Sequence, residues 1–267
     1  MTAAQLKRRL DYFFNSRAYD RHEVAEFARR AAERGHLYIV GGMLRDLCLA
    51  GNRGFFSDVD FIIEGCSPRE FQTFMASLGA QQNRFGGYRT KFRRWTVDIW
   101  RLEDTWARKA GFCKVETVQD VAQATFFDWD AIFYDFAKKE IITEDDYFSR
   151  LKNRVLEVRL ASNPNLLGNV VRALRYANKW HAIFGPRLAR LVLREIVNSG
   201  WDKLVAYEAA TFADRQLPSL DGEEIEQRLR RYDRTGKPSD LKITQTDAQL
   251  TLPLVGRCQE AQLALPF

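Results

Sequence analysis

The sequence has few of the residues that build zinc sites and disulfide frameworks. It contains only four Cys and three His in 267 residues, and no two cysteines have the CxxC spacing. Structural zinc sites and disulfide-rich scaffolds require such ligands in close pairs. We therefore expect reduced thiols, with Cys48 and Cys113 serving as small buried apolar side chains.

Long apolar runs are also absent. No stretch approaches the roughly 18 to 20 consecutive apolar residues that a membrane-spanning helix needs. The polar, amphipathic segment Met1–Arg17 lacks the apolar centre of a secretory signal. With 46% hydrophobic and 13% aromatic residues, the chain has enough apolar side chains for one large core or two modest ones. We expect a folded, cytoplasmic protein with no membrane partner.

Charge is unevenly distributed along the chain. The net charge is +6, but residues 147–200 hold ten Lys and Arg against two Glu, a local charge of +8, so the remainder sums to −2. Such clustering is typical of a surface that binds a polyanion, although a solvated helical face gives similar counts. The sequence therefore points to the second half of the chain as the candidate polyanion surface.

Helix and strand signals divide the chain into three parts. Two helices are predicted before residue 36, and two capping boxes have the required spacing of three residues, Asp20 with Glu23 and Ser67 with Glu70. From residue 36 the signals alternate between strands and helices, and from residue 145 they are almost wholly helical. We predict an α+β fold consisting of a helical pair (1–35), a head with a mixed sheet and flanking helices (36–144), and an all-α C-terminal domain (145–267).

Three aspartates are the strongest candidates for chemistry. Asp58 and Asp60 stand at i and i+2 of a predicted strand, so both carboxylates face the same side. Adjacent carboxylates repel each other unless a cation lies between them, and a divalent ion suits that geometry. Asp98, on another predicted strand, would bind a second ion or accept a proton. The simpler alternatives are a turn for the pair and an ion pair with Arg94 or Arg101 for Asp98.

A Gly-Gly turn precedes these carboxylates. Gly41 and Gly42 follow the apolar strand His36–Val40 and open a helix, which leaves backbone N–H groups free at its positive end, with Arg45 nearby. A lone Gly-Gly turn is weak evidence. The order strand, Gly-Gly, Arg-Asp, helix, loop and DxD, however, indicates a nucleoside triphosphate (NTP) held over Mg²⁺ or Mn²⁺.

With these motifs, residues 36–182 resemble the head of the class II tRNA nucleotidyltransferase and poly(A) polymerase family of the polymerase β nucleotidyltransferase superfamily. In that family the Gly-Gly-x-x-Arg-Asp segment holds the triphosphate and the DxD pair binds the catalytic metals. Arg84-Phe-Gly-Gly-Tyr88 and Val97-Asp-Ile99 look like its hairpin and third acidic strand. The resemblance therefore implies nucleotide-binding roles for Gly41, Gly42, Arg45 and Asp46, and metal-binding, catalytic roles for Asp58, Asp60 and Asp98.

Later residues extend the resemblance. Arg172-Ala-Leu-Arg175-Tyr176 is similar to the neck helix of the family, where arginines approach the nucleotide. This implies nucleotide contacts from Arg172 and Arg175, with an exposed helical face as the alternative. Trp95, Trp100 and Trp106 are interpreted as core residues, with base-stacking surfaces as the alternative.

Two segments depart from the family pattern. Where the family has Arg-Arg-Asp-Phe-Thr-Ile-Asn-Ala, this chain has Ala124-Thr-Phe-Phe-Asp-Trp-Asp-Ala131, so Asp130 stands in place of the asparagine. The acidic pair and arginine that distinguish CTP from ATP are absent after Ser162-Asn-Pro164, so base choice is not inherited. The chain after residue 182 is shorter than the body and tail of family members, which argues against CCA addition as such.

The resulting hypothesis is a Mg²⁺-dependent nucleotidyltransferase that transfers a nucleoside monophosphate (NMP) from an NTP to a hydroxyl, most simply a tRNA or other RNA 3′ end. Candidate RNA contacts are Lys152, Arg154, Arg187 and Arg190. Two alternatives stay open. A protein or small-molecule acceptor, as in nucleotidylating toxins or resistance enzymes, is favoured by the short C-terminal half. A catalytically inactive nucleotide-binding module is favoured by the missing Arg-Arg-Asp segment.

Overall fold

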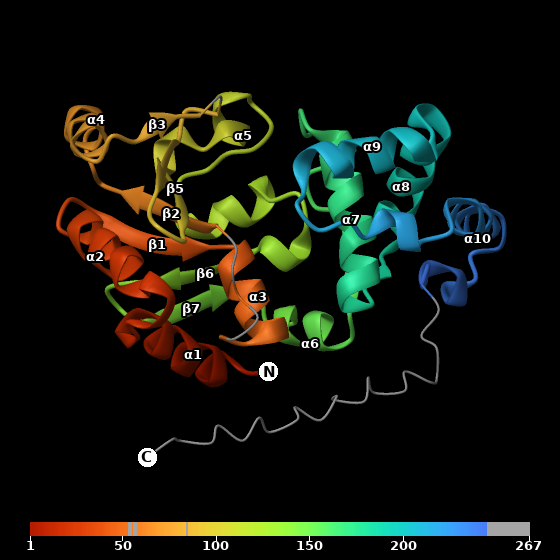
Figure 1. The fold of residues 1–267 in the computed structure, drawn as a ribbon, viewed down its shortest axis with the longest axis horizontal. Coiled ribbons are helices and arrows are strands. Elements are labelled where there is room, and N and C mark those ends of the chain that lie inside the picture. The colour runs from red at the N-terminus through yellow and green to blue at the C-terminus, as the bar shows by residue number, and fades with distance from the viewer. Residues whose placement is uncertain (53–54, 56–57, 84, 245–267) are drawn as a thin grey trace, which may run out of the picture.

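The computed structural model describes residues 1–52, 55, 58–83 and 85–244. Arg84 of the predicted hairpin and Cys258 lie outside the described residues. Two helices, α1 (Ala3–Asn15) and α2 (Arg21–Ala32), precede a mixed sheet in one half of the molecule, and a group of helices forms the other half (Figure 1).

The sheet has the strand order β3-β4-β5-β2-β1-β6-β7. Strands β2 and β5 are parallel, and all other neighbours are antiparallel. The strands are β1 (His36–Val40), β2 (Val59–Glu64), β3 (Gln81–Gln82), β4 (Tyr88–Lys91), β5 (Thr96–Arg101), β6 (Ile132–Asp135) and β7 (Glu140–Thr143).

Helices follow the strands in the way the sequence predicts. In the head these are α3 (Gly42–Ala50), α4 (Pro68–Ser77) and α5 (Trp106–Lys109). The second half contains α6 (Tyr147–Lys152), α7 (Leu166–Trp180), α8 (Pro186–Ser199), α9 (Trp201–Thr211) and α10 (Gly222–Thr235), interrupted by the two-residue strands β8 (Val155–Leu156) and β9 (Ile183–Phe184). The prediction of a mixed sheet with flanking helices followed by a helical region is confirmed.

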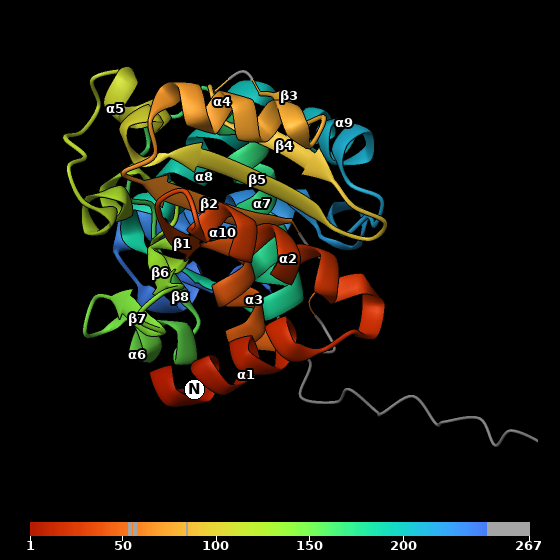
Figure 2. The same ribbon diagram turned by 90° about the vertical axis from the view of Figure 1, so that its left-hand side faces the viewer.

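Alternate residues of the central strands enter two different cores. Phe61 and Ile63 pack with residues of α1 to α4, whereas Ile62 packs with the segment 102–124 on the opposite face of the sheet. The period of two in a strand produces this division. Figure 2 shows the N-terminal helices α1 and α2 and helix α3 lying across one side of the strands. The larger core continues into the second half through residues such as Leu174 and Val192, so the two halves pack on each other.

One predicted capping box is confirmed and the other is wrong. Ser67 accepts a hydrogen bond from the N–H of Glu70, and the Glu70 side chain accepts one from the N–H of Ser67. Asp20, by contrast, has φ 58° and its side chain caps no N–H group. The Glu23 carboxylate instead accepts a hydrogen bond from the backbone N–H of Arg93 at 3.1 Å, so a tertiary contact replaces the local cap.

Within the described ranges, no helix has both the length and the apolar character needed to cross a membrane.

Candidate active site

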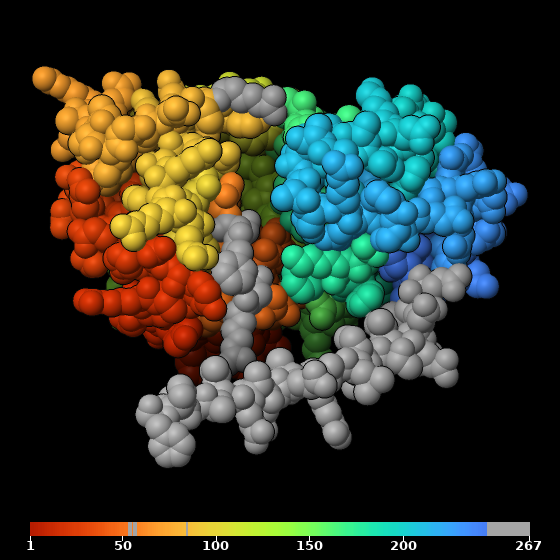
Figure 3. All heavy atoms as spheres, in the orientation of Figure 1, coloured from red at the N-terminus to blue at the C-terminus, as the bar shows by residue number. Residues whose placement is uncertain are grey.

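A cleft of about 820 Å³ lies between the sheet and α7. In Figure 3 it appears as a depression between the yellow surface of the β-hairpin and the cyan surface of the helices. Its charged lining residues are seven Asp against five Arg and Lys, which gives the cleft a formal charge of −2: Asp46, Asp58, Asp60, Asp98, Asp104, Asp130, Asp214, Arg45, Arg89, Arg172, Arg175 and Lys179.

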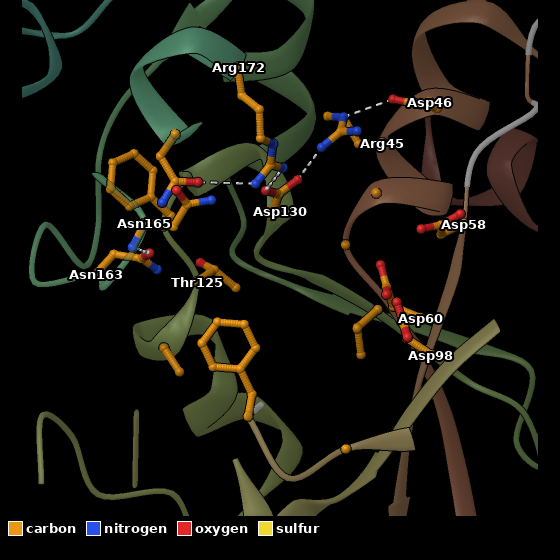
Figure 4. Close-up of a pocket in the computed structure, with 18 of the residues that line it drawn as sticks. Arg45, Asp46, Asp58, Asp60, Asp98, Thr125, Asp130, Asn163, Asn165 and Arg172 are labelled. Atoms are coloured by element: carbon orange, nitrogen blue, oxygen red, sulfur yellow. Dashed lines mark hydrogen bonds and ion pairs between the residues drawn. The ribbon is translucent and has the colours of Figure 1, made fainter. Parts of the chain in front are cut away.

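The structure brings Asp60 and Asp98 together on neighbouring strands. They are direct partners in the parallel register of β2 and β5, so their side chains share one face of the sheet. Asp58 lies two residues before Asp60 and also lines the cleft (Figure 4). All three predicted metal-binding aspartates therefore face one cavity.

Asp60 is the least compensated of these carboxylates. Burial, followed by the charges of Asp98, Asp58 and Asp130, raises the pKa of Asp60 to about 7. No hydrogen bond or ion pair reaches its carboxylate from the described residues. Burial also raises the pKa of Asp58, although the neighbouring Arg89 opposes that shift. A carboxylate in this position lacks only a cation.

The Gly-Gly turn delivers the beginning of α3 to these carboxylates. Gly41 has φ 60°, a conformation that glycine adopts without strain, and its N–H donates to Ile132 O at 3.0 Å. A Cβ atom at Gly42 would lie 3.9 Å from Asp60 Oδ2. Since the first helical hydrogen bond is Arg45 N to Gly41 O, the preceding N–H groups have no acceptor within the helix. This end of α3 can therefore hold an anion beside the aspartates.

Arg45 is buried in an ion-pair network that also holds Arg172. Its Nε donates to Asp46 Oδ1 at 2.8 Å and its Nη1 donates to Asp130 Oδ1. The other oxygen of Asp130 accepts from Arg172 Nη2 at 3.1 Å, as Figure 4 shows. The guanidinium of Arg45 also lies 4.7 Å from the centre of the Tyr176 ring. The network ties α3 of the head to α7.

Arg175 lines the cleft, but its guanidinium is occupied. It donates to the fully buried carboxylate of Glu208 and, at 2.7 Å, to Asp214. It also lies 4.1 Å from the centre of the Phe212 ring. These contacts join α7 to the end of α9 and the segment after it, and the predicted nucleotide contact of Arg175 remains a prediction.

The structure separates the four candidate RNA residues. Arg187 and Arg190 lie on α8 and line a groove of about 540 Å³ between α8 and α10, together with Arg194 and Arg230, which the sequence reasoning missed. Asp233 is the single acidic residue that lines this groove, and it pairs with Arg190 at 3.3 Å. Neither Lys152 nor Arg154 lines it. Arg154 instead has φ 61° and accepts the N–H of Ile183.

Of the three tryptophans assigned to the core, Trp95 is buried, but Trp100 and Trp106 line the cleft. Trp106 contacts Phe85 and Phe112 edge-on or tilted, with ring centres 6.3 and 5.6 Å apart. The opposite wall is formed by Thr125 and by the amides of Asn163, Asn165 and Asn169 (Figure 4). The cleft therefore has one aromatic and one amide wall.

The donor set fits a divalent cation that shares its ligands with a substrate. Within the described residues, no three His, Cys, Asp or Glu side chains are arranged to hold a metal ion by themselves. Mg²⁺ in nucleotide sites commonly takes one or two carboxylates and completes its shell with phosphate oxygens and water. The unpartnered carboxylate of Asp60 and the formal charge of −2 fit that arrangement.

The sequence matches no protein-family model and no curated protein. Solved structures are nevertheless similar in fold. The Thermotoga maritima CCA-adding enzyme complexed with tRNA matches with a TM-score of 0.56 and 16% identity over 84% of this chain and 53% of that one. A tRNA nucleotidyltransferase complexed with a primer tRNA and an incoming ATP analogue gives 0.52 and 17% identity over 77% and 61%, and a tRNA-processing enzyme complex gives 0.54 and 17% over 77% and 56%.

These similarities establish the fold, which is that of a nucleotidyltransferase head. The chain spans about half the length of the solved structures it matches. The resemblance predicted from the Gly-Gly and DxD motifs is thereby confirmed for the fold, because the same kind of structure was found by comparing coordinates.

Proposed function

We propose that the protein transfers an NMP from an NTP to a hydroxyl acceptor, most simply the 3′ end of an RNA. The observation that carries the proposal is the meeting of three aspartates from β2 and β5 with the N-terminus of α3 in one cleft. Carboxylates for a divalent ion beside free N–H groups for phosphate are the two features that phosphoryl transfer to a hydroxyl requires.

Each group in the cleft has a chemical task in this proposal. Asp58, Asp60 and Asp98 would hold the divalent ion, which when bound would stabilise negative charge on the reacting phosphate. The first N–H groups of α3 would accept phosphate oxygens. The acceptor oxygen would bond to the α-phosphorus, the bond to the β-phosphate oxygen would break, and pyrophosphate would leave. Asp98 is the candidate to take the hydroxyl proton, because it lies beside Asp60 at the cleft surface.

An RNA acceptor is supported by charge as well as by fold. The groove between α8 and α10 is lined by four arginines and one aspartate, a formal charge of +3. Arg194 and Arg187 are exposed and form no ion pair with a described carboxylate. Phosphate backbones bind to surfaces of this kind. Two of the matched structures also contain a tRNA.

Labelled substrates test the proposal directly. The protein is incubated with each α-³²P-labelled NTP, Mg²⁺ and a mixture of total RNA, cell protein and small metabolites, and the products are separated by class. We expect label in RNA from the wild type and none from the Asp58→Asn or Asp60→Asn variants. Label in protein or small molecules would replace the acceptor, and no label in any fraction would refute the transferase.

A further inference from the structure

Arg89, on β4, occupies the space between two of the candidate metal ligands. Its Nε donates to Asp98 Oδ1 at 2.9 Å and its Nη2 to Asp98 Oδ2 at 2.5 Å, so the planar guanidinium grips both carboxylate oxygens. The same Nη2 lies 3.3 Å from Asp58 Oδ2. One side chain therefore bridges carboxylates that come from two separate segments.

The backbone fixes this bridge. Strands β4 and β5 form a hairpin closed by a hydrogen bond from Phe92 N to Trp95 O, and in its register Arg89 is the direct partner of Asp98. Side chains of directly opposed residues lie on the same face of an antiparallel pair, at close distance. The hairpin thus places a cation on Asp98 whenever it folds.

The three aspartates are consequently unequal. Asp98 and Asp58 have Arg89 as a positive neighbour, whereas no described side chain pairs with Asp60. The Arg89 side chain is 48% exposed, so it has solvent into which it can withdraw. A guanidinium and a divalent ion cannot both occupy the inner position on the same carboxylate oxygens.

We propose that Arg89 is an internal counter-ion of Asp58 and Asp98, which competes with the divalent cation for these carboxylates and thereby limits the metal affinity of the cleft. The proposal rests on the proposed function, because it takes the same aspartates as the metal ligands. It has a clear consequence. A cation reaches Asp60 without competition, but it reaches Asp98 only after Arg89 has moved away.

Two other roles of Arg89 predict the opposite change in metal affinity. If its contacts only hold the hairpin in place, removing the side chain disorders Asp98 and weakens metal binding. If it acts only as a contact for the triphosphate, metal binding without nucleotide is unchanged. A counter-ion gives the third result, in which removing Arg89 strengthens metal binding because a nearby positive charge is lost.

The experiment is a titration of the nucleotide-free protein with Mn²⁺, followed by electron paramagnetic resonance of the free ion at low ionic strength. Arg89→Gln removes the charge, and Arg89→Lys keeps it but loses the two-pronged grip. Arg93→Gln is the matched control, since it removes one charge from the same hairpin and no hydrogen bond joins its side chain to Asp58 or Asp98. Circular dichroism checks that each variant is folded.

We expect Arg89→Gln to lower the dissociation constant for Mn²⁺ about tenfold, Arg89→Lys to lower it roughly threefold, and Arg93→Gln to leave it within about twofold. Unchanged or weaker binding in both Arg89 variants, with the wild type binding Mn²⁺, overturns the counter-ion and leaves the proposed function intact. If the wild type binds no Mn²⁺, the metal site fails and the proposed function fails with it. If Arg89→Gln does not fold, Arg89→Lys decides the sign alone.

Discussion

Replacing Asp60 with Asn tests whether the cleft contains an uncompensated negative charge. The pKa of this carboxyl is about 7 in the folded protein, because of burial and the neighbouring aspartates, and about 3.9 in an unfolded chain. The folded state therefore binds this proton more tightly than the unfolded state. The resulting stability is fully present below about pH 4 and is lost as the pH rises through 7.

The size of the effect follows from the two pKa values. A difference of about three pH units corresponds to about 4 kcal/mol between the protonated and ionised forms. The Asp60→Asn variant never ionises, so above pH 8 it avoids this cost. We expect it to be more stable than the wild type by up to about 4 kcal/mol at pH 8 and equally stable at pH 4. The figure is an upper limit because Asp58 and Asp98 titrate together with Asp60.

The assay is urea denaturation in EDTA between pH 4 and 9, repeated with Mg²⁺. Added Mg²⁺ should narrow the difference at pH 8, since only the wild type has the carboxylate that binds the ion. Asp145→Asn is the control, because Asp145 is exposed and lies outside the cleft. A wild type that is as stable as the Asp60→Asn variant at pH 8 in EDTA would refute the reasoning.

Three further changes separate the roles of the cleft and the groove. Asp98→Asn should slow NMP transfer by about 10² or more while NTP affinity, measured by fluorescence titration, stays constant; a loss of NTP binding would make Asp98 a binding residue. Arg175→Gln leaves Glu208 buried without its cation, so urea denaturation should show a loss of about 3 kcal/mol; unchanged stability with a raised KM would restore the predicted nucleotide contact. RNA binding should lose salt dependence, by a log–log slope of about 0.7 to 0.9 per phosphate contact, when Gln replaces the groove residues Arg187, Arg190 and Arg194; an unaltered slope would place the RNA elsewhere.

Local patterns were sufficient to predict the centre of the fold. The apolar run before Gly41 and the alternation after Asp58 gave β1 and β2 within a residue, because strand pairing in a head of this kind follows the hydrophobic period closely. The same patterns predicted that Asp58 and Asp60 share a face. They did not show that Asp98 would be the direct neighbour of Asp60, because the register between two distant strands is decided by packing across the sheet.

Arg89 shows what additional signal was available. The segment 88–102 has the composition of strands throughout, and its division into β4 and β5 depends on a turn at Phe92–Trp95. Once that turn is recognised, antiparallel pairing places Arg89 opposite Asp98. The partners of Arg45 and Arg172 carried no such signal, because Asp130 reaches them from a short helical turn whose position is determined only by tertiary contacts.

Asp130 also changes how the cleft must attract a triphosphate. The resemblance places an asparagine at this position, and an amide would leave Arg45 and Arg172 with their full positive charge. Here one carboxylate pairs with both arginines, and Asp46 pairs with Arg45 as well. Arg175 is similarly held by Glu208 and Asp214, so most of the positive side chains at the cleft are already neutralised. A tetravalent nucleotide entering a cleft of formal charge −2 therefore requires divalent cations to accompany it, with the N-terminus of α3 as the remaining positive surface.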